Sequence, residues 1–402
     1  MNRKIKLLVL TDINVSNVHL MLASILNNFR EWEVSFLNVR NPVDHFDDSR
    51  WYDTSIQPFD ISSRFNTSNL MGRLAKVIHV ISQHDVVFCT GAVANLAILC
   101  NKPYIYFCTG SDLDQYSKYG CSFFEYIDTD ISLLRRMQWP IKKYLYQTAI
   151  KKADLTVIAP YQYPEIYKLG YSRLGFFPHP LEQEYFKIEL SEKDYISHQI
   201  KDKYRCKWVL FSPTRHIWDD VYKNESDYKG NNITIKSFSL LIKEYNLVDA
   251  KLFLVEKGLD VPKSKRYIQE LGIENNIVWL EPMNRKELIN FYAGADVCFD
   301  QFSQGCLALC AVESLACGTP TVSYIGSYNY KEIPFYSESP PIINSKDPQL
   351  ISSYIYDILN NYDMRHELQR QSYYWVKKHC TYEQINAAFL EMVNSISKGY
   401  LI

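Results

Sequence analysis

Long apolar runs are missing from this sequence. No window of its 402 residues approaches about 18 unbroken apolar residues, the length that a membrane-spanning helix requires. The apolar run near the amino terminus stops at Thr11 and Asp12, which fits a first strand better than a secretory signal. We therefore expect a cytoplasmic protein with no transmembrane segment.

An excess of charge of one sign is missing as well. The 44 Lys and Arg residues nearly balance the 45 Asp and Glu residues, for a net charge of −1. A protein that binds nucleic acid through its overall charge needs a basic surplus, so we expect no nucleic-acid partner. The 10 cysteines include no Cys-x-x-Cys pair, and most lie in apolar segments, so neither a zinc site nor a disulfide framework is expected.

Several loop motifs with a defined chemistry are absent. The sequence has no Gly-x-x-x-x-Gly-Lys-Ser/Thr phosphate loop and no Gly-x-Gly-x-x-Gly fingerprint after a strand. It also has no Gly-x-Ser-x-Gly elbow. These absences argue against the reactions that those motifs serve.

Apolar runs of strand length alternate with amphipathic stretches along most of the chain. The pattern begins with a strand at 6–10, changes at the stiff segment 176–180 and restarts after it. Such alternation predicts βαβ units with parallel sheets. We therefore predict an α/β protein with two doubly wound, Rossmann-like domains that face each other across a central cleft. The predicted ranges are 1–185 and 186–378, followed at 379–402 by a terminal helix that could pack back on the first domain.

One segment, residues 300–320, carries the clearest chemical signal. A strand ends at Phe299, a loop containing Gly305 follows, and a helix then runs to a capping glycine, Gly318. A strand, a glycine loop and a helix N-terminus together form an anion site, because free backbone N–H groups point at the bound group. Glu313 lies on this helix among apolar neighbours, so its carboxylate needs a partner. The ribose diol of a bound nucleotide and a salt bridge within the protein both remain open.

This segment resembles the donor-binding loop and helix of retaining glycosyltransferases of family 4, which have the GT-B fold. The likeness is to the variant typical of bacterial surface-polysaccharide biosynthesis, and it extends over most of the second domain and more weakly over the first. Gly305 departs from the family's Glu-x7-Glu motif, where the first glutamate would stand, and Ala308 replaces a loop glycine of the variant. The matching positions are Asp300, Gln301, Gly305, Glu313, Ala316, Gly318 and Pro320.

A second constellation surrounds Arg215 and Lys229. Arg215 follows a predicted strand, and Lys229 precedes a predicted helix after a polar loop. Two fixed cations near a helix N-terminus suit a nucleoside diphosphate, because they offset the charge that builds on the leaving phosphate. In the resembled family, an arginine and a lysine at these positions have that role. The resemblance therefore implies catalytic roles for Arg215, Lys229 and Glu313.

The resemblance also implies the other donor contacts. The loop that precedes the Glu313 helix would hold the sugar and the phosphates, and the loop at 281–284 would hold the nucleobase. Gln301 could make some of the hydrogen bonds that the missing glutamate would make. The implied donor-binding residues are Gln301, Gly305, Cys306, Leu307, Pro282 and Met283.

Acceptor contacts are expected in the first domain. The run Thr109-Gly110-Ser111-Asp112 resembles the family's His-Gly-Ser-Asp segment at the cleft, with Thr109 in the histidine position. Asp112 is a candidate for holding an acceptor hydroxyl, and the alternative is a turn aspartate that caps the following helix. Thr11, Asp12 and Asn14, after the first strand, could also face the acceptor.

The segment 133–152 interleaves basic pairs with aliphatic and aromatic residues. Such a segment could rest on an anionic membrane surface, which would suit a lipid-linked acceptor. The alternative is a packed helix, or a pair of helices, with a solvated basic face.

These observations lead to one predicted function. We predict a metal-independent glycosyltransferase of the hexosyltransferase type, with no cofactor, that moves a sugar from a nucleoside-diphosphate sugar to a glycan or lipid-linked acceptor with retention. It would serve cell-surface polysaccharide biosynthesis from the cytoplasm or from the inner face of the cell membrane. Asp-x-Asp matches at 112–114 and 128–130 lack a context that supports a metal site. The alternatives are a nucleotide-sugar 2-epimerase and a catalytically silent sugar-nucleotide-binding partner subunit.

Overall fold

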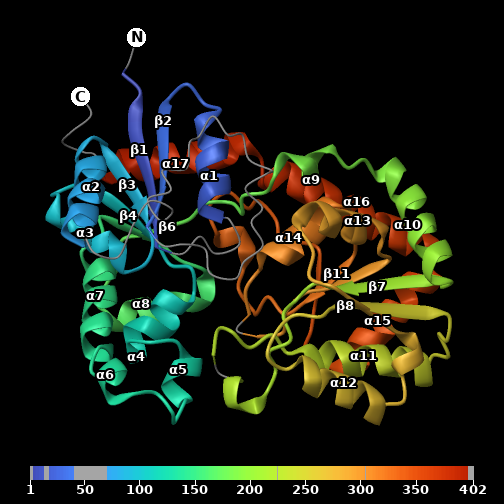
Figure 1. Ribbon diagram of the computed structural model, residues 1–402. Coiled ribbons are helices and arrows are strands. Elements are labelled where there is room, and N and C mark those ends of the chain that lie inside the picture. The colour runs from blue at the N-terminus through green and yellow to red at the C-terminus, as the bar shows by residue number, and fades with distance from the viewer. Residues whose placement is uncertain (1–2, 13–17, 40–69, 224, 304, 397–402) are drawn as a thin grey trace. The chain divides into compact units, whose positions relative to one another are not determined.

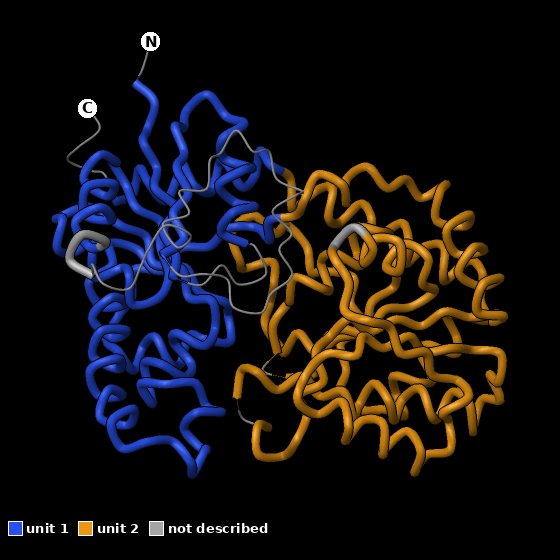
Figure 2. Tube along the Cα trace, viewed as in Figure 1, with its two compact units in different colours: residues 1–180, 382–402 blue, residues 181–381 orange. Residues whose placement is uncertain are grey.

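The computed structural model describes residues 3–12, 18–39, 70–223, 225–303 and 305–396. The chain forms two compact units, of which unit 1 comprises residues 1–180 and 382–402 and unit 2 comprises residues 181–381 (Figure 2). The chain therefore leaves unit 1 slightly before the boundary predicted at 185. The reason is local, because the short helix α9 (Gln183–Lys187) contacts α14 (Leu309–Ala316) of unit 2.

Unit 1 is built on a parallel sheet of six strands in the order β2-β1-β3-β4-β5-β6 (Figure 1). Its strand β1 (Ile5–Thr11), which lies between β2 and β3, is mostly apolar, and its side chains alternate between two separate cores. Leu7 and Val9 pack into one core, whereas Leu8 and Leu10 pack into the other. A strand buried on both faces is what a doubly wound sheet requires, because helices cover each face.

The other elements of unit 1 connect these strands or cover them. They are α1 (Val18–Asn27), β2 (Trp32–Asn38), α2 (Leu70–Ser82), β3 (Val86–Cys89), η4 (Ala92–Ala94), α3 (Asn95–Leu99), β4 (Tyr104–Phe107), η5 (Asp112–Tyr116), α4 (Ser117–Tyr119), α5 (Phe123–Ile127), α6 (Leu133–Arg136), α7 (Trp139–Lys151), β5 (Leu155–Val157), η6 (Pro160–Gln162), α8 (Tyr163–Lys168), β6 (Leu174–Gly175) and α17 (Tyr382–Ile396). The segment 133–152, predicted as one helix or a pair, forms the pair α6 and α7.

The terminal helix α17 belongs to unit 1, although it follows unit 2 in the chain (Figure 2). Its apolar side buries Phe389 and Val393 in the same core as Leu7, and the helix contacts α1. A hydrogen bond of 2.6 Å from Trp32 Nε1 to Asn386 Oδ1 adds a buried polar link. The last helix of the sequence thus completes the core of the first unit.

Unit 2 is built on a second parallel sheet of six strands, in the order β12-β11-β10-β7-β8-β9. On one face Leu210 of β7 packs with Phe238 of α11, and on the other face Phe211 contacts the rings of Phe291 and Tyr292 of α13. The elements are α9, α10 (Leu190–Tyr204), β7 (Trp208–Ser212), η7 (Asp220–Tyr222), α11 (Asn231–Lys243), β8 (Ala250–Val255), α12 (Val261–Glu270), η8 (Glu274–Asn276), β9 (Ile277–Leu280), α13 (Arg285–Gly294), β10 (Val297–Phe299), α14, β11 (Thr321–Ser323), η9 (Tyr330–Glu332), β12 (Ile342–Asn344), α15 (Pro348–Asn360) and α16 (Tyr362–His379).

Each sheet reverses its strand order at one point. In unit 1 the chain turns from one side of β1 to the other, so the reversal lies between β1 and β3. In unit 2 the same reversal lies between β7 and β10. In open α/β sheets, ligands bind outside the carboxyl ends of the strands at such a point. The loops that follow these four strands are therefore the first places to look for a site.

Candidate functional site

Two loops of unit 2 meet at the reversal between β7 and β10. The first runs from the end of β7 to α11, and the second runs from the end of β10 to α14. The backbone N–H of Phe302 donates to the carbonyl oxygen of Lys229 at 2.9 Å and joins them. Gly230 has a φ of 69°, and a Cβ there would lie 3.0 Å from Phe302 Cβ. A glycine at this position therefore lets the two loops approach closely.

The structure brings the two predicted cations together at this junction. Lys229 Nζ donates to Gln301 Oε1 at 2.9 Å, and Arg215 Nη2 lies 3.1 Å from Asp227 Oδ1. Burial lowers the pKa of Lys229, and the positive charge of Arg215 lowers it further. The two side chains are thus close enough to repel each other, and an anion placed beside both would relieve that repulsion.

Gln301 connects the cation to the second loop. Its amide oxygen accepts from Lys229, and its amide nitrogen donates to Cys306 Sγ at 3.2 Å. Asp300, the preceding residue, is buried beneath, where Ser323 Oγ donates to Oδ2 at 3.2 Å. Burial raises the pKa of Asp300 to about 6, and the charge of Lys229 opposes that rise. The side chains of both residues therefore serve to hold Lys229 and its surroundings in place.

The second loop leads into the N-terminus of α14. Gly305 has a φ of 85°, and a Cβ there would lie 2.9 Å from the Cα of Gly326, so the two backbones touch. The N–H of Leu307 donates to the Tyr330 hydroxyl at 2.8 Å. Ala308 is the N-cap of α14 and provides no side-chain hydrogen bond to the helix. The first turn of α14 can therefore offer its N–H groups to an anion, which the helix dipole also favours.

Glu313, on the second turn of α14, is buried. Its Oε2 accepts a hydrogen bond of 2.9 Å from the hydroxyl of Tyr292 on α13. Burial raises the pKa of Tyr292 far above its ordinary value, so its hydroxyl stays a donor. The sequence predicted that Glu313 needs a partner but did not identify Tyr292, because the two residues lie on different helices.

The predicted base-binding loop follows β9. Pro282 and Met283 are half-buried there, and Asn284 then begins α13 with a reciprocal capping box to Glu287. Trp279 of β9 lies beside the ring of His216, with 5.1 Å between ring centroids. This contact links the loop after β7 to the strand that precedes the predicted base-binding loop.

His216 has a structural place next to Arg215. Its Nδ1 lies 2.8 Å from Ser264 Oγ, and burial lowers the pKa of His216 to about 4. Gly258 has a φ of 117°, and a side chain there would collide with the His216 backbone. The loop that carries Arg215 is therefore held on its far side by the end of β8 and by α12.

In unit 1, the predicted acceptor residues lie after β4. Thr109 is half-buried, and Asp112 is buried at the start of η5. The Asp112 carboxylate accepts from Thr90 Oγ1 and from the Leu113 N–H, each at 3.1 Å. Asp112 thus links Thr90, which follows β3, to the first turn of η5, whose N-cap residue is Ser111. Asn14 lies outside the described residues.

Two further acids lie close to Asp112, and of these the sequence suggested an acceptor role for Asp12 but not for Asp114. Asp12 is buried at the end of β1, and its carboxylate packs against Gly91, where a Cβ would collide with it. Asp114 accepts from the Tyr161 hydroxyl at 2.9 Å, and burial raises the pKa of Asp114 to about 7. The reversal point of unit 1 therefore gathers carboxylates, whereas that of unit 2 gathers the cations Arg215 and Lys229 together with Asp227 and Asp300.

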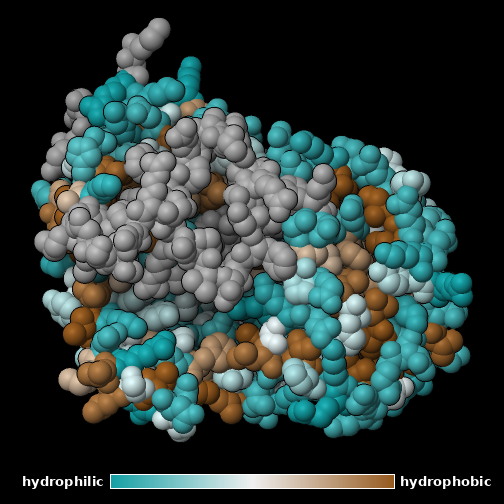
Figure 3. All heavy atoms as spheres, in the orientation of Figure 1, coloured by the Kyte–Doolittle hydropathy of each residue, from teal (hydrophilic) through white to brown (hydrophobic). Residues whose placement is uncertain are grey.

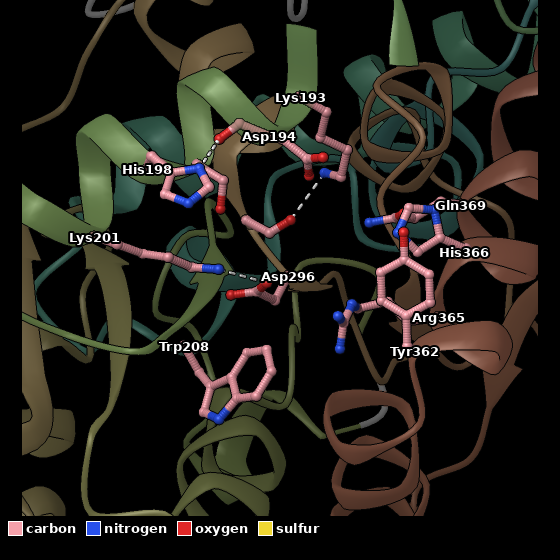
Figure 4. A pocket seen from close by; sticks show the side chains of 12 residues that line it. Lys193, Asp194, His198, Lys201, Trp208, Asp296, Tyr362, Arg365, His366 and Gln369 are labelled. Carbon is pink, nitrogen blue, oxygen red and sulfur yellow. Dashed lines mark hydrogen bonds and ion pairs between the residues drawn. The ribbon is translucent and has the colours of Figure 1, made fainter. Parts of the chain in front are cut away.

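A separate cavity of about 210 Å³ lies at the opposite, amino edge of the unit 2 sheet (Figure 4). Figure 4 shows Lys201 reaching to Asp296, and the two are joined at 2.9 Å. Asp296 Oδ2 also accepts from the N–H of Val209, and Arg365 lies over the ring of Trp208. These pairs fasten α10 and α16 to the sheet, so the cavity is distinct from the loops that carry the predicted site.

The two doubly wound units define the GT-B fold, as solved structures of similar architecture show. Anabaena HepE in complex with UDP matches with a TM-score of 0.67 and 13% identity over 98% of this chain and 100% of that chain. A glycosyltransferase from Rickettsia africae matches with a TM-score of 0.67 and 13% identity over 99% and 100%. WaaG, a glycosyltransferase involved in lipopolysaccharide biosynthesis, matches with a TM-score of 0.61 and 12% identity over 98% and 100%.

Sequence comparison narrows the class within unit 2. Residues 221–375 match the family described as Glycosyl transferases group 1, a region that contains Lys229 and Glu313 but not Arg215. D-inositol 3-phosphate glycosyltransferase of Mycolicibacterium smegmatis is 42% identical over 59 residues, which are 14% of this chain and 13% of that protein. The Corynebacterium urealyticum enzyme of the same name is 27% identical over 143 residues, 34% of this chain and 33% of that protein. The matches thus span a third or less of either relative, and together with the fold they support a GT-B glycosyltransferase.

Across the described parts of the chain, no helix is both long enough and apolar enough to cross a membrane.

Proposed function

We propose that this protein is a retaining glycosyltransferase of family 4 that transfers a hexose from a nucleoside-diphosphate sugar to a glycan or lipid-linked acceptor. The observation that carries the proposal is the meeting of Arg215 and Lys229 at the β7–β10 reversal, beside α14, whose N-cap residue Ala308 makes no side-chain hydrogen bond to the helix. The group 1 family match supports it, as do HepE complexes with UDP and with UDP-glucose.

In this proposal, different residues of unit 2 bind different parts of the donor. Arg215 and Lys229 hold the diphosphate, together with the N–H groups at the start of α14. Glu313 accepts the ribose hydroxyls, and Tyr292 keeps its carboxylate oriented. Gln301 positions Lys229, and the loop with Pro282 and Met283 receives the base. Gly305 and Cys306 lie where the sugar would join the phosphates.

In the proposed reaction, the bond between the anomeric carbon and the β-phosphate oxygen breaks while a bond from the acceptor oxygen to the same face of that carbon forms. The acceptor proton passes to the departing phosphate oxygen. Arg215 and Lys229 stabilise the negative charge on the leaving group, because they are held in place before the reaction begins. In this proposal they supply the charge compensation without a metal ion.

The acceptor belongs to unit 1 in this proposal. The carboxyl end of β4 presents Thr109, and Asp112 orients Thr90 at the end of β3. Carboxylates in this place suit a polyhydroxylated acceptor, because each can accept hydrogen bonds from sugar hydroxyls. We place the reaction in cell-surface polysaccharide biosynthesis at the inner face of the cell membrane, where a lipid-linked acceptor is available.

A silent sugar-nucleotide-binding subunit is the second candidate. It is favoured by Gly305, which stands where the family's motif has a glutamate that contacts the sugar. Such a subunit would bind the same nucleotide at the same cations without transferring the sugar.

A turnover assay separates these candidates. The full chain would be incubated with labelled UDP-glucose or GDP-mannose, a chelator, and a bacterial extract of lipid-linked glycans. The proposal expects label in the acceptor fraction, an α-linkage by NMR, and loss of transfer in Lys229→Met but not in Lys243→Met, an exposed lysine of α11. Epimerised nucleotide without transfer, or tight binding with no turnover, would show that the transferase assignment is wrong.

A further inference from the structure

The helices α6 and α7 of unit 1 carry an apolar face that points to solvent. Isolated exposed apolar side chains are ordinary on a protein surface, but a contiguous set marks an interaction site. Figure 3 shows apolar residues gathered at the lower left, over α6 and α7. Five of these side chains have exposed fractions between 62% and 77%: Leu133, Leu134, Met137, Ile141 and Tyr144.

Two of these residues lie on α7 itself. Ile141 and Tyr144 are three positions apart, which places them on one face of that helix, and Met137 lies in the turn between α6 and α7. The opposite face of α7 is the one that packs on the sheet, through Ala149 and Ile150. An apolar stripe of helical period normally faces a core. Ile141 and Tyr144 therefore give α7 a second apolar face, besides the face that packs in the core of unit 1.

The same segment is strongly basic. Residues 133–152 contain six cations and no acid: Arg135, Arg136, Lys142, Lys143, Lys151 and Lys152. Arg135 pairs with Glu125 at 2.6 Å, and Arg136 donates to the carbonyl oxygen of Asp128 at 3.0 Å. The carboxylates of Asp128 and of nearby Asp130 offset only part of this charge. The apolar stripe is therefore bordered by a clear excess of positive charge.

We propose that this face of α6 and α7, the stripe of Leu133, Leu134, Met137, Ile141 and Tyr144, docks on the surface of an anionic lipid bilayer. The aliphatic side chains enter the boundary between headgroups and acyl chains, and Lys142 and Lys143 reach the lipid phosphates. Tyr144 suits this boundary, because its ring is apolar and its hydroxyl is polar.

The charge of the segment favours a bilayer over a second copy of the chain. A symmetric contact between two copies would set the same basic segment against itself, so cations would oppose cations. A bilayer that contains anionic lipid offers the complementary charge together with an apolar interior. The docking does not depend on the transfer reaction proposed above, although it would bring unit 1 to lipid-linked acceptors.

The test is vesicle flotation of the full-length protein. The vesicles are phosphatidylcholine alone or phosphatidylcholine with phosphatidylglycerol, at low and at physiological salt. We expect binding to the mixed vesicles that weakens with salt, and at least about tenfold weaker binding for Lys142→Glu with Lys143→Glu. The triple variant Leu134→Gln, Met137→Gln, Ile141→Gln should lose binding as well. Its control is Val248→Gln with Leu259→Gln, which are 56% and 62% exposed on unit 2.

Three outcomes would overturn the proposal. They are equal binding to both vesicle types, unchanged binding by the triple and charge variants, and a wild-type dimer that becomes a monomer in the triple variant by light scattering. The last would make this face a protein interface. UDP calorimetry on the same samples distinguishes the docking proposal from the proposed function. If the wild type fails to bind UDP, the donor site of unit 2 is wrong, but the vesicle result still tests the docking of α6 and α7.

Discussion

At Lys229, the folded chain holds a buried amine beside a guanidinium. Burial and the nearby charge of Arg215 both lower the pKa of Lys229, so the arrangement is unfavourable by itself. Gln301 and Asp227 offset part of this unfavourable energy, because Gln301 accepts a hydrogen bond from Lys229 and Asp227 pairs with Arg215. A diphosphate would reduce it further, because two negative charges would then face two positive ones. This balance of charge is the basis on which we propose that the two cations bind a diphosphate.

Gly305→Ala tests the contact between the donor loop and Gly326. A Cβ at this position would lie 2.9 Å from Gly326 Cα, at a backbone φ of 85°. We expect about tenfold weaker UDP binding, because the loop that leads into α14 must move. Gly272→Ala is the matched control, since Gly272 has a φ of 60° with nothing within 4 Å of its Cβ position. Gly272→Ala should lower the free energy of unfolding by about 1–2 kcal/mol and keep its UDP affinity. Equal losses of UDP affinity in both variants would contradict the role of the Gly305 loop in donor binding.

His19 makes the stability of unit 1 depend on pH. Burial lowers the pKa of His19 from 6.5 to about 3, so the folded chain stays neutral where the unfolded chain is protonated. The contribution of neutral His19 to the free energy of unfolding is fully present above pH 6.5. It is lost as the pH falls towards 3, by up to about 1.4 kcal/mol per pH unit. His19→Phe should flatten this dependence in urea unfolding at pH 5 and pH 7.5. His198→Phe, at an exposed position, should not, and the same slope in all three proteins would show that His19 is not responsible.

The residues that define the site were only partly predictable from the sequence. Arg215, Lys229 and Glu313 were identified because they stand at strand and helix ends with recognisable spacing. Asp227 and Tyr292 were not, because their role depends on which side chains meet in space. The roles assigned to all of these residues stay predictions until binding is measured.

At the level of elements, Lys193 fastens α10 to the sheet of unit 2. Its buried Nζ donates to the carbonyl oxygens of Ala293 and Ala295 and to Thr319 Oγ1, at 2.6, 2.9 and 2.6 Å. Lys193→Met should lower the free energy of unfolding by about 1–3 kcal/mol, because it leaves buried acceptors unpaired. Urea unfolding would measure this. Lys203→Met, an exposed change on the same helix, should have little effect, and equal effects would contradict the role of Lys193.

Most strands were predictable from the sequence, and two strands at the sheet edges were not. Apolar runs such as 6–10 and 208–212 correspond to β1 and β7, because buried parallel strands need continuous apolar residues. The strands β6 and β12 were missed, although β10, which also has three residues, was predicted. Both missed strands lie at the edge of a sheet, where their pairing depends on one neighbouring strand.

At the level of the whole molecule, the carboxyl-terminal helix completes the core of the amino-terminal unit. Phe389 of α17 is fully buried and contacts the rings of Phe88 and Phe177. Phe389→Ala should therefore destabilise unit 1 by about 3–5 kcal/mol, as measured by urea unfolding. UDP affinity should be unchanged, because the donor residues belong to unit 2. Glu391→Ala, on the exposed side of α17, is the control, and a loss of UDP affinity in Phe389→Ala alone would contradict the division.

Calorimetric titration of UDP and GDP into the wild type, Arg215→Ala, Lys229→Met and Glu313→Ala tests whether unit 2 binds the nucleotide at these residues. We predict micromolar binding of one nucleotide and at least about tenfold weaker binding in each variant, or roughly 1.4 kcal/mol each. Lys243→Met should bind as the wild type does. If neither nucleotide binds, or if the three substitutions leave the affinity unchanged, the meeting of Arg215 and Lys229 at the β7–β10 reversal is not a donor site.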